Sequence, residues 1–343
     1  MLIRQNAPVF GASGNIVPEP GDLDFTVSYR GLHSDNHYNG TVPQRQRQVL
    51  GTYVVNNQQV LDLYGSYAAT RRLSFSLSVP YIDASWSVPT PISTVGPRAE
   101  QNGRGLGDVV VSGGVWLFNP EKHKTGNFSV TVGCKAPTGD YKQKDNYPDI
   151  ITGANNVLKV VDQSVQPGDG GWGIVLGLQG FKKVQKVILF GSANYLANPR
   201  DTNGAPSIVA GLGFGGNPNF KDVLVNSVPD SYLLRTGLTF PIKGRLSGSL
   251  GFRMEGLPRY DIIGDSHGWR RPGYETFIEP GLIYSTENTT WSLHVPAALV
   301  RNRQANPGTG NPGDATFPDY IFLAGYSYRF PDFGHRLTKG SGS

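Results

Sequence analysis

The sequence predicts an all-β fold, a transmembrane antiparallel up-and-down β-barrel of about 12 strands. Apolar and polar residues alternate along many segments, long and short connections alternate between these segments, and only 38% of residues are hydrophobic. Residues 71–82, RRLSFSLSVPYI, show the alternation clearly. A period of two is that of a β-strand. In a membrane barrel, lipid surrounds the apolar face and the lumen receives the serines.

Segments with this alternation follow one another along the chain, and each is close to the roughly 9–11 residues that a tilted strand needs to cross a bilayer. No run of about 18 apolar residues offers a membrane helix instead. The predicted strands lie near residues 22–30, 60–70, 72–82, 106–117, 128–136, 172–180, 187–196, 231–240, 246–256, 274–284, 290–300 and 319–330.

The connections between these segments are sorted by length. Short links, such as TRR and PIKGR, alternate with long ones near 31–59, 83–105, 137–171, 197–230, 257–273 and 301–318. Outer-membrane barrels have short periplasmic turns and long extracellular loops. The sorting therefore predicts a protein of the outer membrane of a Gram-negative bacterium. Two long loops contain apolar stretches, 157–165 and 207–216, which would be either extracellular hairpins or extra wall strands, giving 12 or 14 strands.

The predicted barrel occupies residues 21–330. Residues 1–20 are rich in Gly, Pro and Asn and are expected to form an unpaired leader that either hangs in the periplasm or folds into the pore. Residues 331–343 form a C-terminal tail whose KGSGS ending is typical of a cloning remnant.

Charge and motifs exclude several classes of function. The net charge is +5, but the basic residues are scattered, so no nucleic-acid partner is expected. GLGFGG at 211–216 has the spacing of a dinucleotide loop but precedes Asn-Pro-Asn where a helix would be needed. We therefore expect no cofactor and no metal. The expected partners are outer-membrane lipid, lipopolysaccharide and a small-molecule solute, and the oligomeric state stays open.

Strand parity assigns a set of polar residues to the lumen, where they are candidates for contact with solute. With the histidine neutral, they carry five positive and five negative charges, which favours neutral solutes or weak ion selectivity. The alternative, that these charges pair across the wall and fill the lumen, stays open. The residues are Arg30, Asp62, Asp108, Lys135, Arg235, Arg253, Glu255, Glu275, Glu279, His294 and Arg329.

One hairpin carries a resemblance to a known family. GLGDVVVSGGVWLF at 105–118 and FSVTVGCKAPTGDY at 128–141 resemble the outer-membrane barrels of the MetA-pathway phenol-degradation family, in which Gly-x-Gly-Asp begins one strand and Pro-Thr-Gly-Asp ends the next. The resemblance implies passage of small, often aromatic or hydrophobic, compounds. From the residues themselves, Gly107, Gly139 and Asp140 are expected to shape the backbone at the barrel mouth.

These observations predict an outer-membrane channel or uptake protein, not an enzyme, that works by facilitated diffusion of small neutral compounds, aromatic or hydrophobic ones among them. The alternative is a barrel enzyme acting on lipid or lipopolysaccharide, because Ser292 and His294 share one strand and Ser266 adjoins a histidine. However, inward parity turns Ser292 and His294 away from lipid. A soluble or purely structural β protein is the third alternative.

Overall fold

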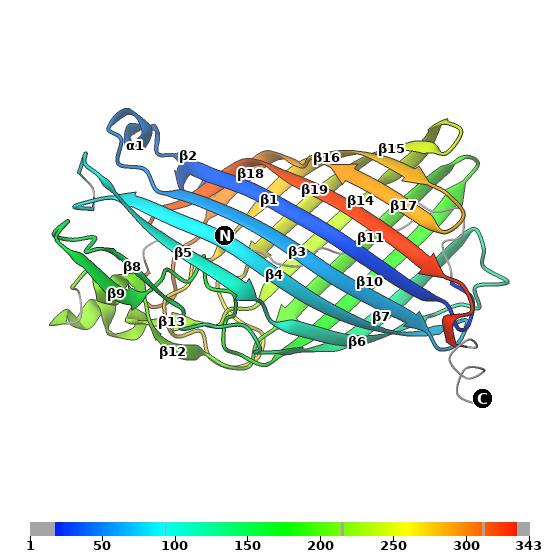
Figure 1. The fold of residues 1–343 in the computed structure, drawn as a ribbon, viewed down its shortest axis with the longest axis horizontal. Helices are drawn as coiled ribbons and strands as arrows, with labels where there is room; N and C mark the ends of the chain where they lie inside the picture. Colours follow the sequence, from blue (N-terminus) through cyan, green and yellow to red (C-terminus); the bar gives the residue numbers. More distant parts are fainter. Residues whose placement is uncertain (1–17, 93, 214–215, 311–312, 335–343) are drawn as a thin grey trace.

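The computed structural model describes residues 18–92, 94–213, 216–310 and 313–334, which form one closed antiparallel barrel of 12 strands. The wall closes where β19 (Ala315–Phe330) pairs with β1 (Leu23–Asn39), and the strands run obliquely around the long axis (Figure 1). Among the described residues, no helix is long and apolar enough to span a membrane. The predicted fold class and strand number are confirmed.

Each predicted strand segment corresponds to one position in the wall. Two positions are occupied by interrupted strands: β5 (Arg98–Leu106) followed by β6 (Val109–Trp116), and β17 (Thr289–His294) followed by β18 (Ala297–Arg303). Pro296 lies at the second interruption, where it cannot donate a ladder hydrogen bond. The remaining wall strands are β3 (Val55–Ala68), β4 (Leu73–Pro89), β7 (Gly126–Ala136), β10 (Gly173–Val184), β11 (Val187–Ala197), β14 (Ser231–Lys243), β15 (Leu246–Leu257) and β16 (Gly273–Ser285).

The long connections contain more regular structure than the sequence indicated. Strands β1, β4 and β5 extend well into segments predicted as loops. The stretch 157–165 begins in a hairpin and 207–213 contains a helical turn, so neither adds to the wall. The loop elements are β2 (Val42–Pro43), α1 (Arg45–Val49), β8 (Lys144–Pro148), β9 (Asn156–Val160), β12 (Thr202–Pro206), α2 (Ile208–Gly211), η2 (Pro218–Val223) and β13 (Val225–Ser227).

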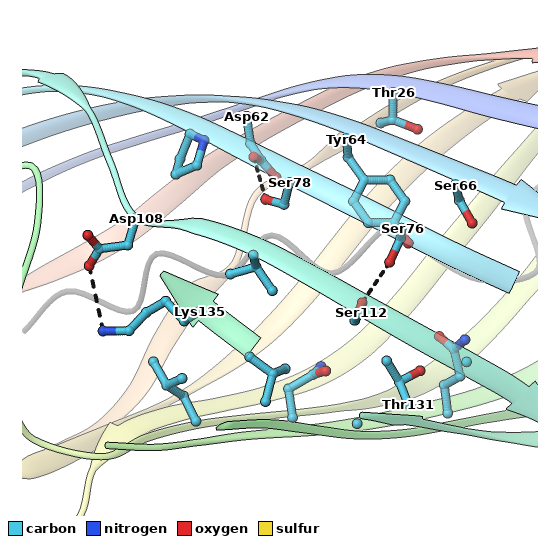
Figure 2. A pocket seen from close by; sticks show the side chains of 18 of the residues that line it. Thr26, Asp62, Tyr64, Ser66, Ser76, Ser78, Asp108, Ser112, Thr131 and Lys135 are labelled. Atoms are coloured by element: carbon cyan, nitrogen blue, oxygen red, sulfur yellow. Dashed lines mark hydrogen bonds and ion pairs between the residues drawn. The ribbon is translucent and has the colours of Figure 1, made fainter. Parts of the chain in front are cut away.

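The two faces of the wall follow the sequence alternation. On β4, Phe75, Leu77 and Tyr81 are 51%, 46% and 43% exposed on the outside, whereas Ser76 and Ser78 point into the lumen (Figure 2). Apolar residues cover the outside of the other wall strands in the same way, as lipid contact requires. Trp116, placed inside by parity, is 7% exposed.

A small apolar core lies at the long-loop end of the barrel. Ile82 and Trp86 on β4 pack with Val161 and Val165 from the connection between β7 and β10, and all four are buried. This packing anchors the segment 161–169 in the barrel mouth. Residues 1–17 of the predicted leader and 335–343 of the predicted tail lie outside the described residues.

Candidate solute path through the barrel

One cavity of about 460 Å³ extends along the lumen among the described residues. At the short-turn end it is lined by Asp24, Thr289 and Arg329, and at the long-loop end by Gln163 and Arg271. Serine and threonine are the most frequent lining residues. The lining therefore includes residues from both ends of the barrel, and hydroxyl groups are its most frequent polar groups.

Hydroxyl groups project into this cavity because they occupy the inward positions of adjacent strands. Ser76 on β4 and Ser112 on β6 face each other in register, with their oxygens 2.6 Å apart (Figure 2). Across the closing pair of strands, the oxygens of Thr26 and Ser327 are 2.8 Å apart. A hydroxyl both donates and accepts hydrogen bonds, so such a wall can exchange bonds with a passing solute.

Four of the predicted lumen residues line the cavity: Asp62, Asp108, Lys135 and Arg329. The Lys135 ammonium lies 3.6 Å from the Asp108 carboxylate and also pairs with Asp169. Arg329 binds Asp24 through two hydrogen bonds of 2.7 and 2.9 Å.

Four charged lining residues were not predicted from the sequence: Asp24, Asp169, Arg271 and Glu287. Asp24 has inward parity on β1 and could have been found from the alternation. Asp169, Arg271 and Glu287 lie in connections, where no periodicity indicates the direction of a side chain.

The other seven predicted residues form a charge cluster on β1 and β14–β17, and none of them is among the residues that line the cavity. Arg30 lies 2.5 Å from Glu255, which also lies 2.6 Å from Arg253. Each of these residues is 1% exposed. The members of the charge cluster are Arg30, Arg235, Arg253, Glu255, Glu275, Glu279 and His294.

Strand register explains how the charge cluster is balanced. Glu255 stands directly opposite Glu275, and Arg235 directly opposite Arg253. Like charges in facing positions are unfavourable. Arg253 offsets the first contact because its guanidinium lies 2.6 Å from Glu255. Glu279 offsets the second because it pairs with Arg235 and lies 3.8 Å from Arg253.

The Gly-x-Gly-Asp and Pro-Thr-Gly-Asp segments form a joint at the barrel mouth. The Asp108 carboxylate accepts hydrogen bonds from the backbone N–H groups of Gly139, at 3.0 Å, and Asp169, at 3.1 Å. A Cβ on Gly139 would lie 2.7 Å from backbone atoms of Gly168, so only glycine permits this approach. The joint holds segment 161–169 against the start of β6.

An ion pair fixes the same segment to the opposite side of the mouth. The Nη1 and Nη2 groups of Arg271 donate hydrogen bonds to the two oxygens of the Asp162 carboxylate, at 2.7 and 2.6 Å. Burial alone would raise the pKa of Asp162, but Arg271 and the backbone N–H of Ser164 outweigh burial and hold that pKa below its usual range. The Asp162–Arg271 pair therefore joins two long loops beside the cavity.

We expect Asp162→Asn to release this segment, because the change removes the charge that neutralises Arg271. Limited proteolysis of the folded, detergent-purified barrel should then cut residues 137–171 faster than in the wild type. A carboxylate with a lowered pKa stabilises the fold above its unfolded pKa, about 3.9, and loses that effect as pH falls through the folded value. The wild-type loop should therefore loosen only below about pH 4.

The matched control is Asp149→Asn, because Asp149 pairs with Lys159 in the same loop but both side chains are more accessible, at 21% and 43% exposed. This change should alter cleavage little, since an exposed ion pair contributes about 0–1 kcal/mol. Equal cleavage rates for Asp162→Asn and the wild type would contradict the role of the Asp162–Arg271 pair.

The serine and histidine candidates for an enzyme do not come together. Among the hydrogen bonds of the described residues, none joins Ser292 or Ser266 to a histidine; the Ser266 oxygen instead accepts a bond from the backbone N–H of Asp261 at 3.0 Å. His294 is 2% exposed, and its Nδ1 lies 3.4 Å from Glu279.

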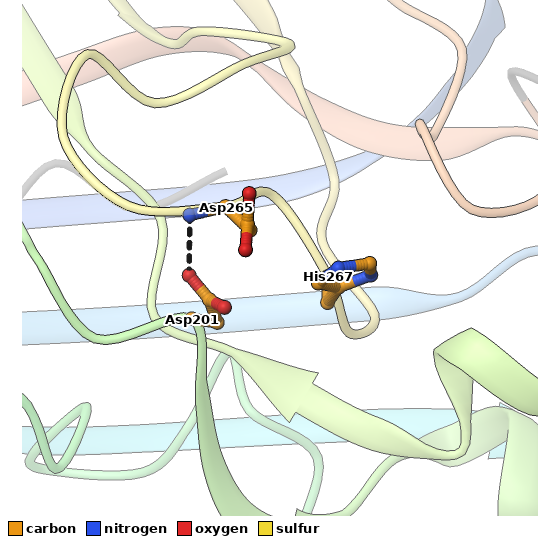
Figure 3. Close-up of side chains that lie close together, drawn as sticks. All are labelled: Asp201, Asp265 and His267. Atoms are coloured by element: carbon orange, nitrogen blue, oxygen red, sulfur yellow. Dashed lines mark hydrogen bonds between the residues drawn. The ribbon is translucent and has the colours of Figure 1, made fainter.

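A possible set of metal ligands lies in the long loops. Ligand atoms of Asp201, Asp265 and His267 lie within 4.8 Å of one another (Figure 3). The backbone N–H of Asp265 donates to Asp201 at 2.7 Å, which fixes that carboxylate. Two of these side chains, Asp265 and His267, are exposed, and exposed acidic groups are common without a metal.

No family model matches the sequence. The structure is similar to the COG4313 outer membrane channel from Pseudomonas putida F1, with a TM-score of 0.60 and 14% identity over 95% of this chain and 100% of that chain. A Pseudomonas aeruginosa FadL homologue matches with a TM-score of 0.44 and 9% identity over 94% of this chain and 96% of its own. The likeness to the Pseudomonas putida channel shows that this chain has the fold of an outer-membrane β-barrel.

Proposed function

We propose that the protein is an outer-membrane channel through which small neutral compounds, aromatic or hydrophobic ones among them, cross by facilitated diffusion. The observation that carries this proposal is a cavity lined by residues from both ends of the barrel. Its hydroxyl groups can exchange hydrogen bonds with a neutral solute. Tyr64 and Trp116 add aromatic surface to the same wall.

The predicted lumen residues divide into two roles in this proposal. Asp62, Asp108, Lys135 and Arg329 meet the solute, because they line the cavity. The charge cluster fills the opposite part of the lumen and limits the width of the path. The resemblance of the hairpin at 105–141 to the MetA-pathway phenol-degradation family supports the choice of aromatic solutes.

Reconstitution tests the proposal. Purified protein, checked for folding by heat-modifiable gel migration, should produce single-channel conductance in planar bilayers. It should also make liposomes swell in a neutral polyol and in phenol, with protein-free liposomes as the control. A folded sample that gives neither conductance nor swelling would rule out a channel.

A further inference from the structure

Asp62 differs from the other aspartates that line the path, and Glu287, the fifth lining carboxylate, is exposed in the short turn between β16 and β17. Asp24 is paired with Arg329, and Asp108 and Asp169 share Lys135. Among the described residues, no cationic side chain forms an ion pair with Asp62. The carboxylate is instead held by the Ser78 hydroxyl, which donates a hydrogen bond of 2.7 Å.

The position of Asp62 brings its charge into the hydroxylated part of the cavity. Asp62 lies on β3 next to Ser78 of β4, and Tyr64 and Ser76 follow on the same two strands towards the short-turn end (Figure 2). Its exposed fraction is only 4%, so bulk water screens the carboxylate weakly. One fixed carboxylate among neutral hydroxyls thus dominates the local field.

The remaining charges of the path do not cancel this field. The described residues that line the cavity include five carboxylates and three cations, a net formal charge of −2. One of the cations, Arg271, is already neutralised by Asp162, which is not a lining residue. The charge cluster holds three arginines and three glutamates, so it supplies no compensating positive charge.

We propose that Asp62, with the hydroxyls of Ser78 and Ser76, is the selectivity site of the channel, which accepts small cations and neutral hydrogen-bond donors and rejects anions. This inference rests on the channel function proposed above. The carboxylate can accept hydrogen bonds from a hydroxyl or ammonium group, whereas a passing carboxylate or chloride would meet a like charge in a narrow path. The proposed substrate class is therefore hydroxylated or protonated-amine compounds, not organic acids.

Reversal potentials in a potassium chloride gradient across a planar bilayer test the site. The wild type should prefer potassium to chloride. Asp62→Asn should lower that permeability ratio by about 25-fold, because one unit charge at about 4 Å, even with the screening of bulk water, changes the passage of each ion by about fivefold and in opposite directions. Asp62→Lys should reverse the preference, and Asp62→Glu should retain it.

The matched control is Asp83→Asn, because Asp83 lies on neighbouring β4 but is exposed on the outer surface. This change should leave the reversal potential unaltered. Should Asp62→Lys fail to show folded migration on gels, Asp62→Asn and Asp62→Ser carry the test, since both fit a wall of small polar side chains. If the folded Asp62 variants conducted and had the same reversal potential as the wild type, the selectivity site would be overturned. The proposed channel function would be unaffected by that result. Absence of conductance in the wild type would instead contradict the channel.

Discussion

Arg253→Gln is expected to lower the free energy of unfolding by about 3–5 kcal/mol, the usual cost of removing one partner from a buried ion pair. Arg253 is 1% exposed and contacts Glu255 at 2.6 Å and Glu279 at 3.8 Å. Without it, the charge cluster would hold three carboxylates and two guanidinium groups. Urea titration of the barrel in detergent, followed by gel migration, should show a lower midpoint with an unchanged slope.

Two further variants separate charge balance from side-chain loss. Arg253→Gln combined with Glu255→Gln restores equal numbers of positive and negative charges, so the double variant should be more stable than Arg253→Gln alone. Arg71→Gln removes a partner of Glu121, and these two side chains are 47% and 55% exposed. Arg71→Gln should lower the free energy of unfolding by only about 0–1 kcal/mol. If Arg253→Gln were as mild as Arg71→Gln, the charge cluster would not be a stabilising unit.

Strand periodicity was sufficient to predict the barrel, because the signal is local to each strand. Lipid demands an apolar residue at every second position, as at Phe75 and Leu77. Strand β5 was missed because it lies above the apolar band: its outward residues include Arg98 and Glu100, so nothing apolar alternates there. The alternation indicates which strand segments contact lipid. The sequence of a strand without that contact lacks the alternation and resembles the sequence of a loop.

Parity identified inward residues but not which of them would line a cavity. Asp62 and Glu275 have the same parity and similar burial, at 4% and 1% exposed. Only Asp62 lines the cavity, because the side chains of the charge cluster meet one another, both within β15 and between strands that are not neighbours in the wall. That outcome depends on register and on the packing of several long side chains together. Loop residues such as Asp162 and Arg271 belong to no periodic pattern. Their pairing could therefore be recognised only in the folded structure.

Leu77→Arg and Ser76→Arg place the same charge on opposite faces of one strand. Leu77 lies between Phe75 and Tyr81 on the outer apolar face of β4, opposite Val111 of β6. An arginine there would enter lipid near the middle of the apolar band. We expect a loss of about 2–4 kcal/mol in the free energy of unfolding in lipid vesicles.

Ser76→Arg should have the opposite profile, because this side chain points into the cavity and contacts Ser112 at 2.6 Å. Loss of the serine pair costs about 0.5–1.5 kcal/mol, and the new guanidinium remains within a polar lumen close to Asp62. The fold should therefore persist, while conductance falls because a long side chain enters a cavity of about 460 Å³. The two measurements are vesicle unfolding for stability and single-channel current for the path. Equal destabilisation by both changes, or an unaltered current in folded Ser76→Arg, would contradict the assignment of the serine face to the solute path.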